Sequence, residues 1–329
     1  MDQDHRRMAT PRRAMLMLGA AALGTPALAQ PAWPTGPVRY IAIFPPGAST
    51  DQLSRIWCNR MTEITGQSFV VENRSGSGGN IGTEVIARAA PDGTTIGLGS
   101  VSSLSIAPTL YRRLAFDVMR DFTYVCGLWQ LPNLLVVRPD LPAQTVPELV
   151  ELCRADPGRY SFGSSGAGTT LHIAGEMFKQ LAGVNILHVP YRGGAPAYAD
   201  LLGGRLDMIF GNIPEALRLS REGKLRPLGV TGATRSPQAP EVPTMAEFLP
   251  GFEINSWGSV IAPAGLPPAM VTRMAELGRA AVESPPVRDR YETAGATAWW
   301  VGPEGLADFR RENEMRFAPL IRASGAVVE

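Results

Sequence analysis

Short apolar runs alternate with amphipathic segments along almost the whole of this 329-residue chain. The run at 38–44, VRYIAIF, is dense in β-branched and aromatic residues, which is typical of a strand buried on both faces. Strands that alternate with helices predict an α/β fold with mainly parallel sheets. Strands are expected at 38–44, 69–71, 95–99, 134–137, 160–163, 186–189, 206–210, 225–231 and 254–262.

Helices are expected between these strands, because apolar residues there recur every three or four positions. The first helix begins near Ser49, where Ser49 and Gln52 have the spacing of a capping box, and it ends at Gly66. Pro303 and Glu304 suit the first turn of the last helix. One helix is expected to start at 169 or 170, and the others are expected at 81–90, 146–154, 195–202, 213–221, 268–282, 287–294 and 303–323.

Glycine, serine and proline gather after the strands rather than after the helices. In open α/β sheets, ligands bind outside the carboxyl ends of the strands, so these turns are expected to share one face of each domain. Two such faces opposed across a cleft would enclose a ligand. The turns concerned lie at 45–49, 100–105, 163–168, 191–194 and 211–212.

The stretch 160–183, YSFGSSGAGTTLHIAGEMFKQLAG, is the strongest candidate for binding an anion. Its helix starts at Thr169 or Thr170, with Glu176 and Lys179 expected on the outer side. The first turn of a helix leaves N–H groups without partners and carries partial positive charge. Hydroxyl groups and glycine-permitted backbone angles add further donors around the same point; they come from Ser164, Ser165, Thr169 and Thr170, with Gly166 and Gly168. An ordinary strand-to-helix turn with a threonine N-cap is the alternative.

The helix after 38–44 has the same construction, and Asp51 lies in its first turn. One interpretation makes this carboxylate a favourable partner of the helix dipole. The other makes it an acceptor for an amine, a hydroxyl or a water of the ligand. Tyr191 and Arg192 leave a similar choice, between covering the far end of the ligand and bracing their own turn, and Trp257 is expected to pack at a hinge.

The first 29 residues have the form of an export signal. Four arginines precede the apolar run 14–23, and Ala27, Leu28 and Ala29 suit a cleavage site. The pair Arg12 and Arg13 resembles a twin-arginine signal, and Sec export or a retained anchor are the alternatives. Removing this segment changes the formal charge from +1 to −1, which leaves no positive field for nucleic acid. The mature chain is expected to be periplasmic and monomeric.

Catalytic chemistry has little support in the sequence. His172 and His188 are the histidines outside the signal, and both are expected to be structural. Neither G-x-S-x-G nor G-x-G-x-x-G is present, and no metal-ligand spacing occurs, so no cofactor or metal is predicted. A hydrolase that pairs Ser165 with His172 is the weaker alternative. Cys58 is expected to be buried, whereas Cys126 and Cys153 either form a disulfide or stay free.

Several blocks in a fixed order resemble the Bug family, the solute receptors of tripartite tricarboxylate transporters. The resemblance spans nearly all of the mature chain. The blocks are FPPGASTDQLSR (44–55), VVENRSGSGGNIGTEVIARAAPDG (70–93), YSFGSSGAGTTLHIAGEMF (160–178), HVPYRGGAPAYADLLGGRLDMIFGN (188–212), GKLRPLGVT (223–231), VPTMAE (242–247) and WGSVIAPAGLP (257–267).

The resemblance implies an α/β periplasmic-binding-protein fold of type II, with two doubly wound domains joined by two crossing strands around a central cleft. Domain 1 would comprise 30–130 and 253–329, and domain 2 would comprise 131–252. It also implies a small carboxylate ligand, an amino, di- or tricarboxylic acid, held by the loops 44–51 and 164–170. The implied partners are the membrane subunits of such a transporter, and a sensor kinase is the alternative.

Two residues depart from the pattern of the family: Gly211 stands where Asp is usual, and Ala48 where a second glycine is usual. The first departure removes a negative charge near the mouth of the expected cleft, which weakens any inference that the ligand carries an ammonium group. The predicted ligand-binding residues are Phe44, Gly47, Ala48, Asp51, Ser102, Ser164, Ser165, Gly168, Thr169, Thr170, Tyr191 and Asn212.

Overall fold

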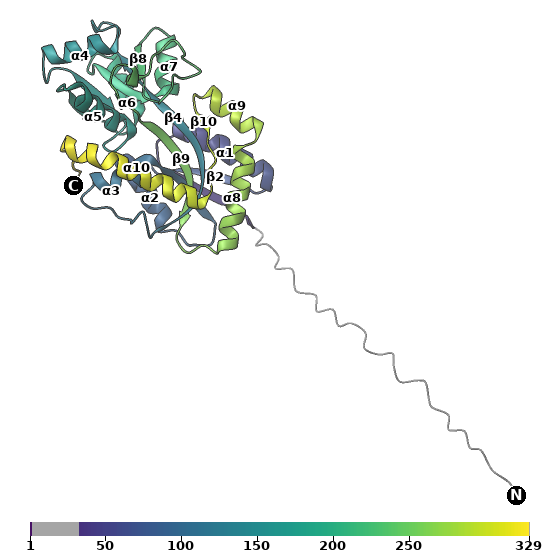
Figure 1. Cartoon of the computed structure of the whole chain (residues 1–329). Coiled ribbons are helices and arrows are strands. Elements are labelled where there is room, and N and C mark those ends of the chain that lie inside the picture. Colours follow the sequence, from purple (N-terminus) through teal and green to yellow (C-terminus); the bar gives the residue numbers. More distant parts are fainter. Residues whose placement is uncertain (2–32, 329) are drawn as a thin grey trace. The chain divides into compact units, whose positions relative to one another are not determined.

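The computed structural model describes Met1 and residues 33–328 (Figure 1). The export signal predicted for residues 1–29 therefore lies, apart from Met1, outside the described residues. Over the part of the chain that is described, no helix has both the length and the apolar character needed to cross a membrane.

The strands join in one mixed sheet in the order β2-β1-β3-β9-β4-β7-β5-β6, with β8 and β10 also paired to β4. The strands near its two ends pair in parallel, as expected from the alternation of strands and helices. We call the two ends the first lobe and the second lobe. The first lobe contains β1 (Val38–Ala42), β2 (Phe69–Asn73) and β3 (Thr95–Ser100), and the second contains β5 (Ser161–Ser164), β6 (Leu187–Pro190), β7 (Met208–Asn212) and β8 (Arg226–Val230).

Two long strands, β4 (Phe122–Val137) and β9 (Asn255–Pro263), connect the lobes, and both are antiparallel to their neighbours. The prediction of a strand at 134–137 alone was wrong, because β4 begins twelve residues earlier. Its register against β9 shifts at Tyr124/Cys126 and at Gly127/Trp129. Such bulges break the alternation of inward and outward side chains on which recognition of a strand depends. The short strand β10 (Thr297–Ala298) pairs with β4 beside them.

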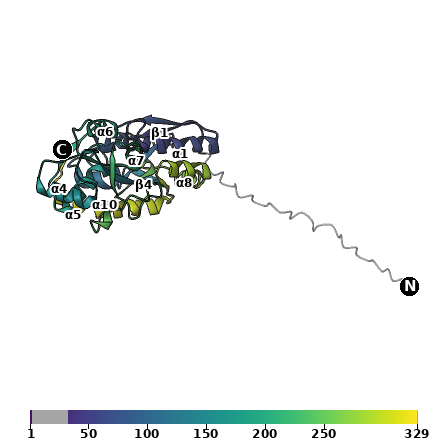
Figure 2. The ribbon, with the colours of Figure 1, turned by 90° about the horizontal axis from the view of Figure 1, so that it is seen from above.

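Helices lie on both faces of this sheet, as Figure 2 shows from above. Most begin and end within two residues of the predicted positions. The bounds are α1 Ser49–Thr65, α2 Asn80–Ala87, α3 Ala107–Leu110, α4 Val146–Ala155, α5 Thr170–Ala182, α6 Gly194–Leu202, α7 Ile213–Arg221, α8 Pro268–Val282, α9 Pro285–Thr293 and α10 Pro303–Ser324, with shorter helical turns η1 Ser77–Gly79, η2 Ser102–Ile106 and η3 Met245–Glu247.

Aromatic side chains fill the core of each lobe and the region where the crossing strands lie. Trp57 packs against Tyr40 and Phe69 in the first lobe. Trp257 on β9 packs edge-on against Phe309 of α10, which agrees with the expected packing role. The helix starts are therefore carried by two well-packed lobes.

The three cysteines are all buried and free. Cys58 lies on α1, as expected. Cys126 lies on β4 and Cys153 on α4, so the alternative of a disulfide between them is not found.

Candidate functional site

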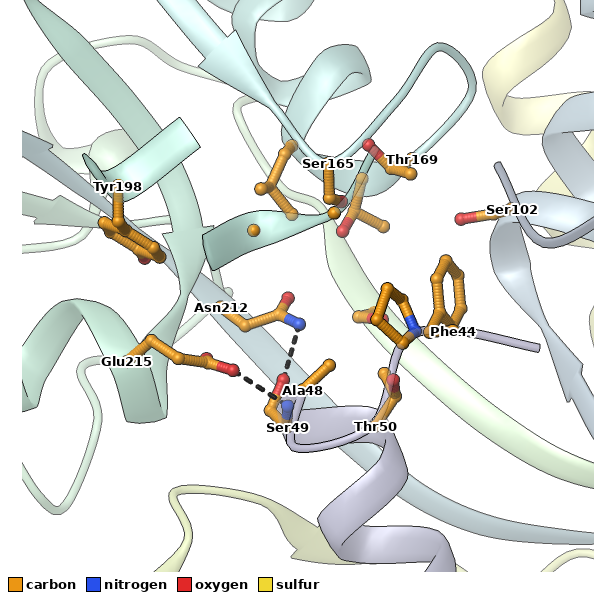
Figure 3. A pocket seen from close by; sticks show the side chains of 16 residues that line it. Phe44, Ala48, Ser49, Thr50, Ser102, Ser165, Thr169, Tyr198, Asn212 and Glu215 are labelled. Carbon is orange, nitrogen blue, oxygen red and sulfur yellow. Dashed lines mark hydrogen bonds between the residues drawn. The ribbon is translucent and has the colours of Figure 1, made fainter. Parts of the chain in front are cut away.

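A cavity lies where the two lobes face each other (Figure 3). Its volume is about 50 Å³, or about 530 Å³ when all the space open to solvent is counted. The turn after β1 and the starts of α1, α5, α6 and α7 contribute residues to its lining. The lining residues are Phe44, Pro45, Ala48, Ser49, Thr50, Ser102, Ser165, Thr169, Thr170, Leu171, Gly193, Gly194, Tyr198, Asn212, Glu215 and Ser256.

The start of α5 presents donors to this cavity. Thr169 is the N-cap and Thr170 the first helical residue, as predicted. The Thr169 hydroxyl donates to the Gly166 carbonyl at 2.8 Å instead of capping the helix, so it does not compete for the first N–H groups. Gly166 and Gly168 have φ of 133° and 81°, angles that other residues rarely adopt. The turn therefore leaves the amide-rich helix start open toward the cavity.

Two stacked histidines support this turn from behind. His172 accepts a hydrogen bond on Nδ1 from the Gly168 N–H at 3.2 Å, and its ring stacks on that of His188 with centroids 4.1 Å apart. Burial lowers the pKa of His172 to about 4 and that of His188 to about 3. Both rings are therefore neutral at pH 7, and the expected structural role of His172 agrees with this contact.

Ser164 and Glu176 also belong to the support rather than to the cavity wall. Ser164 is buried, and its Oγ lies 2.7 Å from His188 Nε2 and accepts from the Gly166 N–H. The prediction that Glu176 lies on the outer side of its helix was wrong, because its side chain is buried and bonded to Lys179 Nζ at 2.9 Å. The four-carbon stem of Lys179 lets the ammonium reach inward.

The start of α1 is already occupied by a carboxylate of the protein. The Ser49 N–H donates to Glu215 Oε1 at 2.8 Å, and Asn212 Nδ2 donates to Ser49 Oγ at 2.8 Å. The predicted capping box does not form, since Ala48 is the N-cap and Ser49 the first helical residue. Both bonds join the first lobe to the second across the cavity, and Figure 3 shows them as dashed lines.

Asp51 does not line the cavity. It accepts hydrogen bonds from the Gly47 N–H at 2.9 Å, Asn73 Nδ2 at 2.8 Å and Arg55 Nε at 3.0 Å. Burial alone would raise the pKa of Asp51, but these hydrogen bonds hold it below its ordinary value. These hydrogen bonds fix the turn before α1, which is a role that neither interpretation of this residue named.

The far side of the cavity carries Tyr198 and Glu215, which sequence reasoning missed. Tyr198 lies on α6 and Glu215 in the first turn of α7. Burial raises the pKa of the Glu215 carboxyl. The acidic residue directly after Pro214 was the available signal, but helical periodicity alone does not tell which face of a short helix borders a cleft.

Seven of the twelve predicted ligand-binding residues line this cavity, namely Phe44, Ala48, Ser102, Ser165, Thr169, Thr170 and Asn212. The other five do not line it, namely Gly47, Asp51, Ser164, Gly168 and Tyr191. The Tyr191 hydroxyl donates to Asp200 Oδ2 at 2.7 Å, which corresponds to the bracing alternative. The five residues act on the shape of the turns that carry the lining.

Ser165 and His172 do not form the catalytic pair that the hydrolase alternative requires. His172 Nδ1 is engaged by Gly168, and its Nε2 faces Glu176 Oε1 at 3.9 Å rather than Ser165. Within residues 33–328, no group of three or more His, Cys, Asp and Glu side chains could hold a metal ion. The site can bind and enclose a ligand through hydrogen bonds.

The fold and the cavity define a type II periplasmic binding protein, with two lobes joined by crossing strands. Residues 53–326 match the family described as tripartite tricarboxylate transporter family receptor. A protein of Pseudomonas sp. strain P51, called UPF0065 protein in tcbD-tcbE intergenic region, is 39% identical over 293 residues, which cover 88% of this chain and 87% of that protein. Protein BugT of Bordetella pertussis is 33% identical over 313 residues, with coverage of 94% and 96%.

Solved structures of similar proteins have the same fold. The R. palustris protein Rpa4515 with adipate has a TM-score of 0.86 at 35% identity, covering 90% of this chain and 99% of its own. The periplasmic binding protein BugD has a TM-score of 0.84 at 31% identity, with coverage of 90% and 100%. MatC from Rhodopseudomonas palustris, with bound malate, has a TM-score of 0.81 at 29% identity, with coverage of 88% and 100%.

The chain therefore belongs to the tripartite tricarboxylate transporter receptor family, which includes the Bug proteins. The resemblance noted in the sequence is confirmed, and so is the type II fold. Members of this family are solute receptors rather than enzymes.

Proposed function

We propose that this protein is an exported periplasmic receptor that binds a small carboxylate in the cavity between its lobes. It then delivers this ligand to the membrane subunits of a tripartite tricarboxylate-type transporter. Family membership supports the receptor class, and the basic, apolar N-terminal segment supports export. The adipate of Rpa4515 and the malate of MatC are both small carboxylates, which supports the choice of ligand class.

The single observation that carries the proposal is the open start of α5 on the wall of the cavity. The N–H groups of its first turn have no partners within the helix, and the N-cap Thr169 makes no side-chain cap hydrogen bond. Ser165 adds a hydroxyl from the turn before α5. Ser102 at the start of η2 and Thr50 on α1 also line the cavity, and Thr50 Oγ1 is buried without a hydrogen-bond partner among the described residues. A ligand carboxylate would satisfy these donors.

Hydrogen bonds of this kind can bind a carboxylate with micromolar affinity without a buried arginine. Each hydrogen bond to a charged group contributes roughly 1.5 to 3 kcal/mol. A micromolar dissociation constant corresponds to about −8 kcal/mol. Four or five bonds exceed that value before the cost of ordering the ligand is subtracted.

Calorimetric titration of the purified mature protein with mono-, di- and tricarboxylates tests the ligand class. We expect at least one small carboxylate to bind, and we expect the double variant Thr50→Val, Thr170→Val to bind it at least tenfold more weakly. Valine keeps the volume of threonine and removes the hydroxyl, which leaves the helix starts in place. Thr272→Val on α8, where the hydroxyl bonds to Pro268, is the matched control. Unchanged binding by the double variant would refute this pocket.

Uptake of the bound carboxylate by cells tests the partner. Deleting the gene of this protein, or separately the neighbouring membrane-protein genes, should abolish growth on that carboxylate. Growth that persists without those membrane genes would favour a sensor that signals to a membrane kinase. Cell fractionation, with the protein in the periplasmic fraction, tests export.

A further inference from the structure

Two buried polar atoms on the far side of the cavity lack hydrogen-bond partners among the described residues. They are the Tyr198 hydroxyl oxygen and Glu215 Oε2. Both residues line the cavity, and Tyr198 is only 7% exposed. Figure 3 shows the two side chains on one side of the cavity, with Ser102 on the opposite side. Leaving such atoms unpaired is costly, so the pair points to a group that the ligand supplies.

Neighbouring residues of the chain hold these two atoms in place. The Ser49 N–H binds Glu215 Oε1, which fixes the carboxylate and leaves Oε2 as the unpaired oxygen. Gly211 makes room for Tyr198, since a Cβ at that position would lie 1.8 Å from the tyrosine oxygen. Gly211, which stands where the family usually has Asp, therefore leaves room for the Tyr198 hydroxyl. Glu215 provides a carboxylate from the next helix.

The chemistry of the pair selects among ligand groups. An ionised carboxylate only accepts hydrogen bonds, whereas a tyrosine hydroxyl donates one and also accepts. A hydroxyl of the ligand can donate to Glu215 Oε2 and accept from Tyr198, so both atoms are satisfied. An ammonium can donate to both atoms but leaves the tyrosine proton unpaired. A second carboxylate would face another acidic group in Glu215, and an apolar end would leave both atoms unpaired.

We propose that Tyr198 and Glu215 form a specificity subsite for a ligand hydroxyl, so that the preferred ligand is a hydroxycarboxylate. The acid group binds at the start of α5, and the hydroxyl faces α6 and α7. This inference rests on the proposed function, because it adds a second contact to the same carboxylate site.

Calorimetric titration with trios of acids that share a carbon skeleton tests the subsite. Each trio carries a hydroxyl, a ketone or only hydrogen at one carbon: lactate, pyruvate and propionate; 2-hydroxyglutarate, 2-oxoglutarate and glutarate; 3-hydroxybutyrate, 3-oxobutyrate and butyrate. We expect the hydroxy acid of at least one trio to bind ten times more tightly than its two partners.

Two variants separate the roles of the pair. Tyr198→Phe removes one hydroxyl and should reduce the preference for the hydroxy acid at least fivefold. Glu215→Gln keeps an acceptor for Ser49 but places an amide donor in the subsite, so the ratio of ketone to hydroxyl affinity should rise at least tenfold. Tyr160→Phe and Glu222→Gln, at positions outside the cavity, are matched controls and should leave every ratio unchanged. Circular dichroism checks that all variants are folded.

The possible failures are distinguishable. Wild-type protein that binds no carboxylate of any kind would refute the proposed function. Wild-type protein that binds carboxylates, but equally within every trio or most tightly to one without a hydroxyl, would overturn the subsite alone. If Tyr198→Phe and Glu215→Gln both leave the affinity ratios within the trios unchanged, the subsite is overturned as well.

Discussion

The starts of α1 and α5 have the same construction but different electrostatic partners. Each follows a strand of its lobe through a glycine-containing turn, and each reaches the cavity. The first N–H of α1 is bound by Glu215, and its first turn contains the ionised Asp51. The first turn of α5 consists of Thr170, Leu171 and His172, none of which is acidic. One helix start is neutralised by the protein, and the other is open.

This difference assigns separate tasks to two elements that look alike in sequence. The positive end of a helix attracts an anion, and a carboxylate of the protein already satisfies the end of α1. The ligand carboxylate is therefore expected at α5. The bonds of Ser49 to Glu215 and Asn212 make the start of α1 a link between the lobes.

The largest effect is expected from a variant in which α5, like α1, has a carboxylate of the protein at its start. Ser165→Asp places an internal carboxylate at the open start of α5, where it would repel the ligand carboxylate. Like charges at such a distance cost several kcal/mol, so we expect binding to weaken about a thousandfold, or about 4 kcal/mol. Calorimetric titration measures this loss.

Ser165→Asn is the neutral control for this variant and should bind within about tenfold of the wild type. The melting temperature of Ser165→Asp should not fall, because an acidic group near a helix start is favourable. Full binding by Ser165→Asp would show that the ligand carboxylate lies elsewhere.

His172 supports the turn before α5, and Asp51 fixes the turn before α1. Their contributions to stability should be lost at different pH. The pKa of His172 is lowered from 6.5 to about 4, so the unfolded chain takes up a proton between these values while the folded protein does not. Stability is complete above pH 6.5 and falls as the pH falls toward 4, by about 3 kcal/mol for this residue. The pKa of Asp51 is also lowered, so its contribution is lost only at more acidic pH.

Urea unfolding from pH 7 to pH 4 measures this loss. In His172→Asn, whose side-chain oxygen can still accept from Gly168, the free energy of unfolding should change less over the same range. A variant with the same pH dependence as the wild type would remove His172 from the explanation.

A smaller effect is expected from breaking the link at α1. Ser49→Pro removes the N–H that donates to Glu215, and proline is accepted at the first position of a helix. Ala48 already has φ −63° and ψ 154°, which a following proline requires. Losing one hydrogen bond to a charged group should destabilise the closed arrangement and weaken ligand binding about tenfold.

Ser49→Ala keeps the N–H that binds Glu215 and removes the hydroxyl that accepts from Asn212, so its effect should be smaller. Small-angle scattering of the ligand-free protein should show a larger radius of gyration for Ser49→Pro than for Ser49→Ala. Equal radii and equal affinities would show that the contact does not hold the lobes together.

The local pattern predicted most of the fold because each helix and most strands carry their own periodicity. The helix 49–65 with its terminal glycine and the helix after Thr169 follow from residues within each segment. Most of β4 could not be predicted, since two register shifts against β9 disturb its alternation. The division into domains at 130 and 252 stays a prediction.

The candidate site was predictable only where it depends on one turn. Ser165, Thr169 and Thr170 follow from the start of one helix and all reach the cavity. Tyr198 and Glu215 come from α6 and α7, two further helices of the same lobe, and their approach to Gly211 and Ser49 depends on how the chain packs. Contacts between distant segments of one chain leave no periodic signal in the sequence.

A crystal structure of the protein with the tightest carboxylate found by titration tests the central claim most directly. The account predicts a carboxylate group within hydrogen-bonding distance of the Thr170 and Leu171 N–H groups, with Glu215 still bound to the Ser49 N–H. A ligand carboxylate at the start of α1, with Glu215 displaced from Ser49, would contradict it.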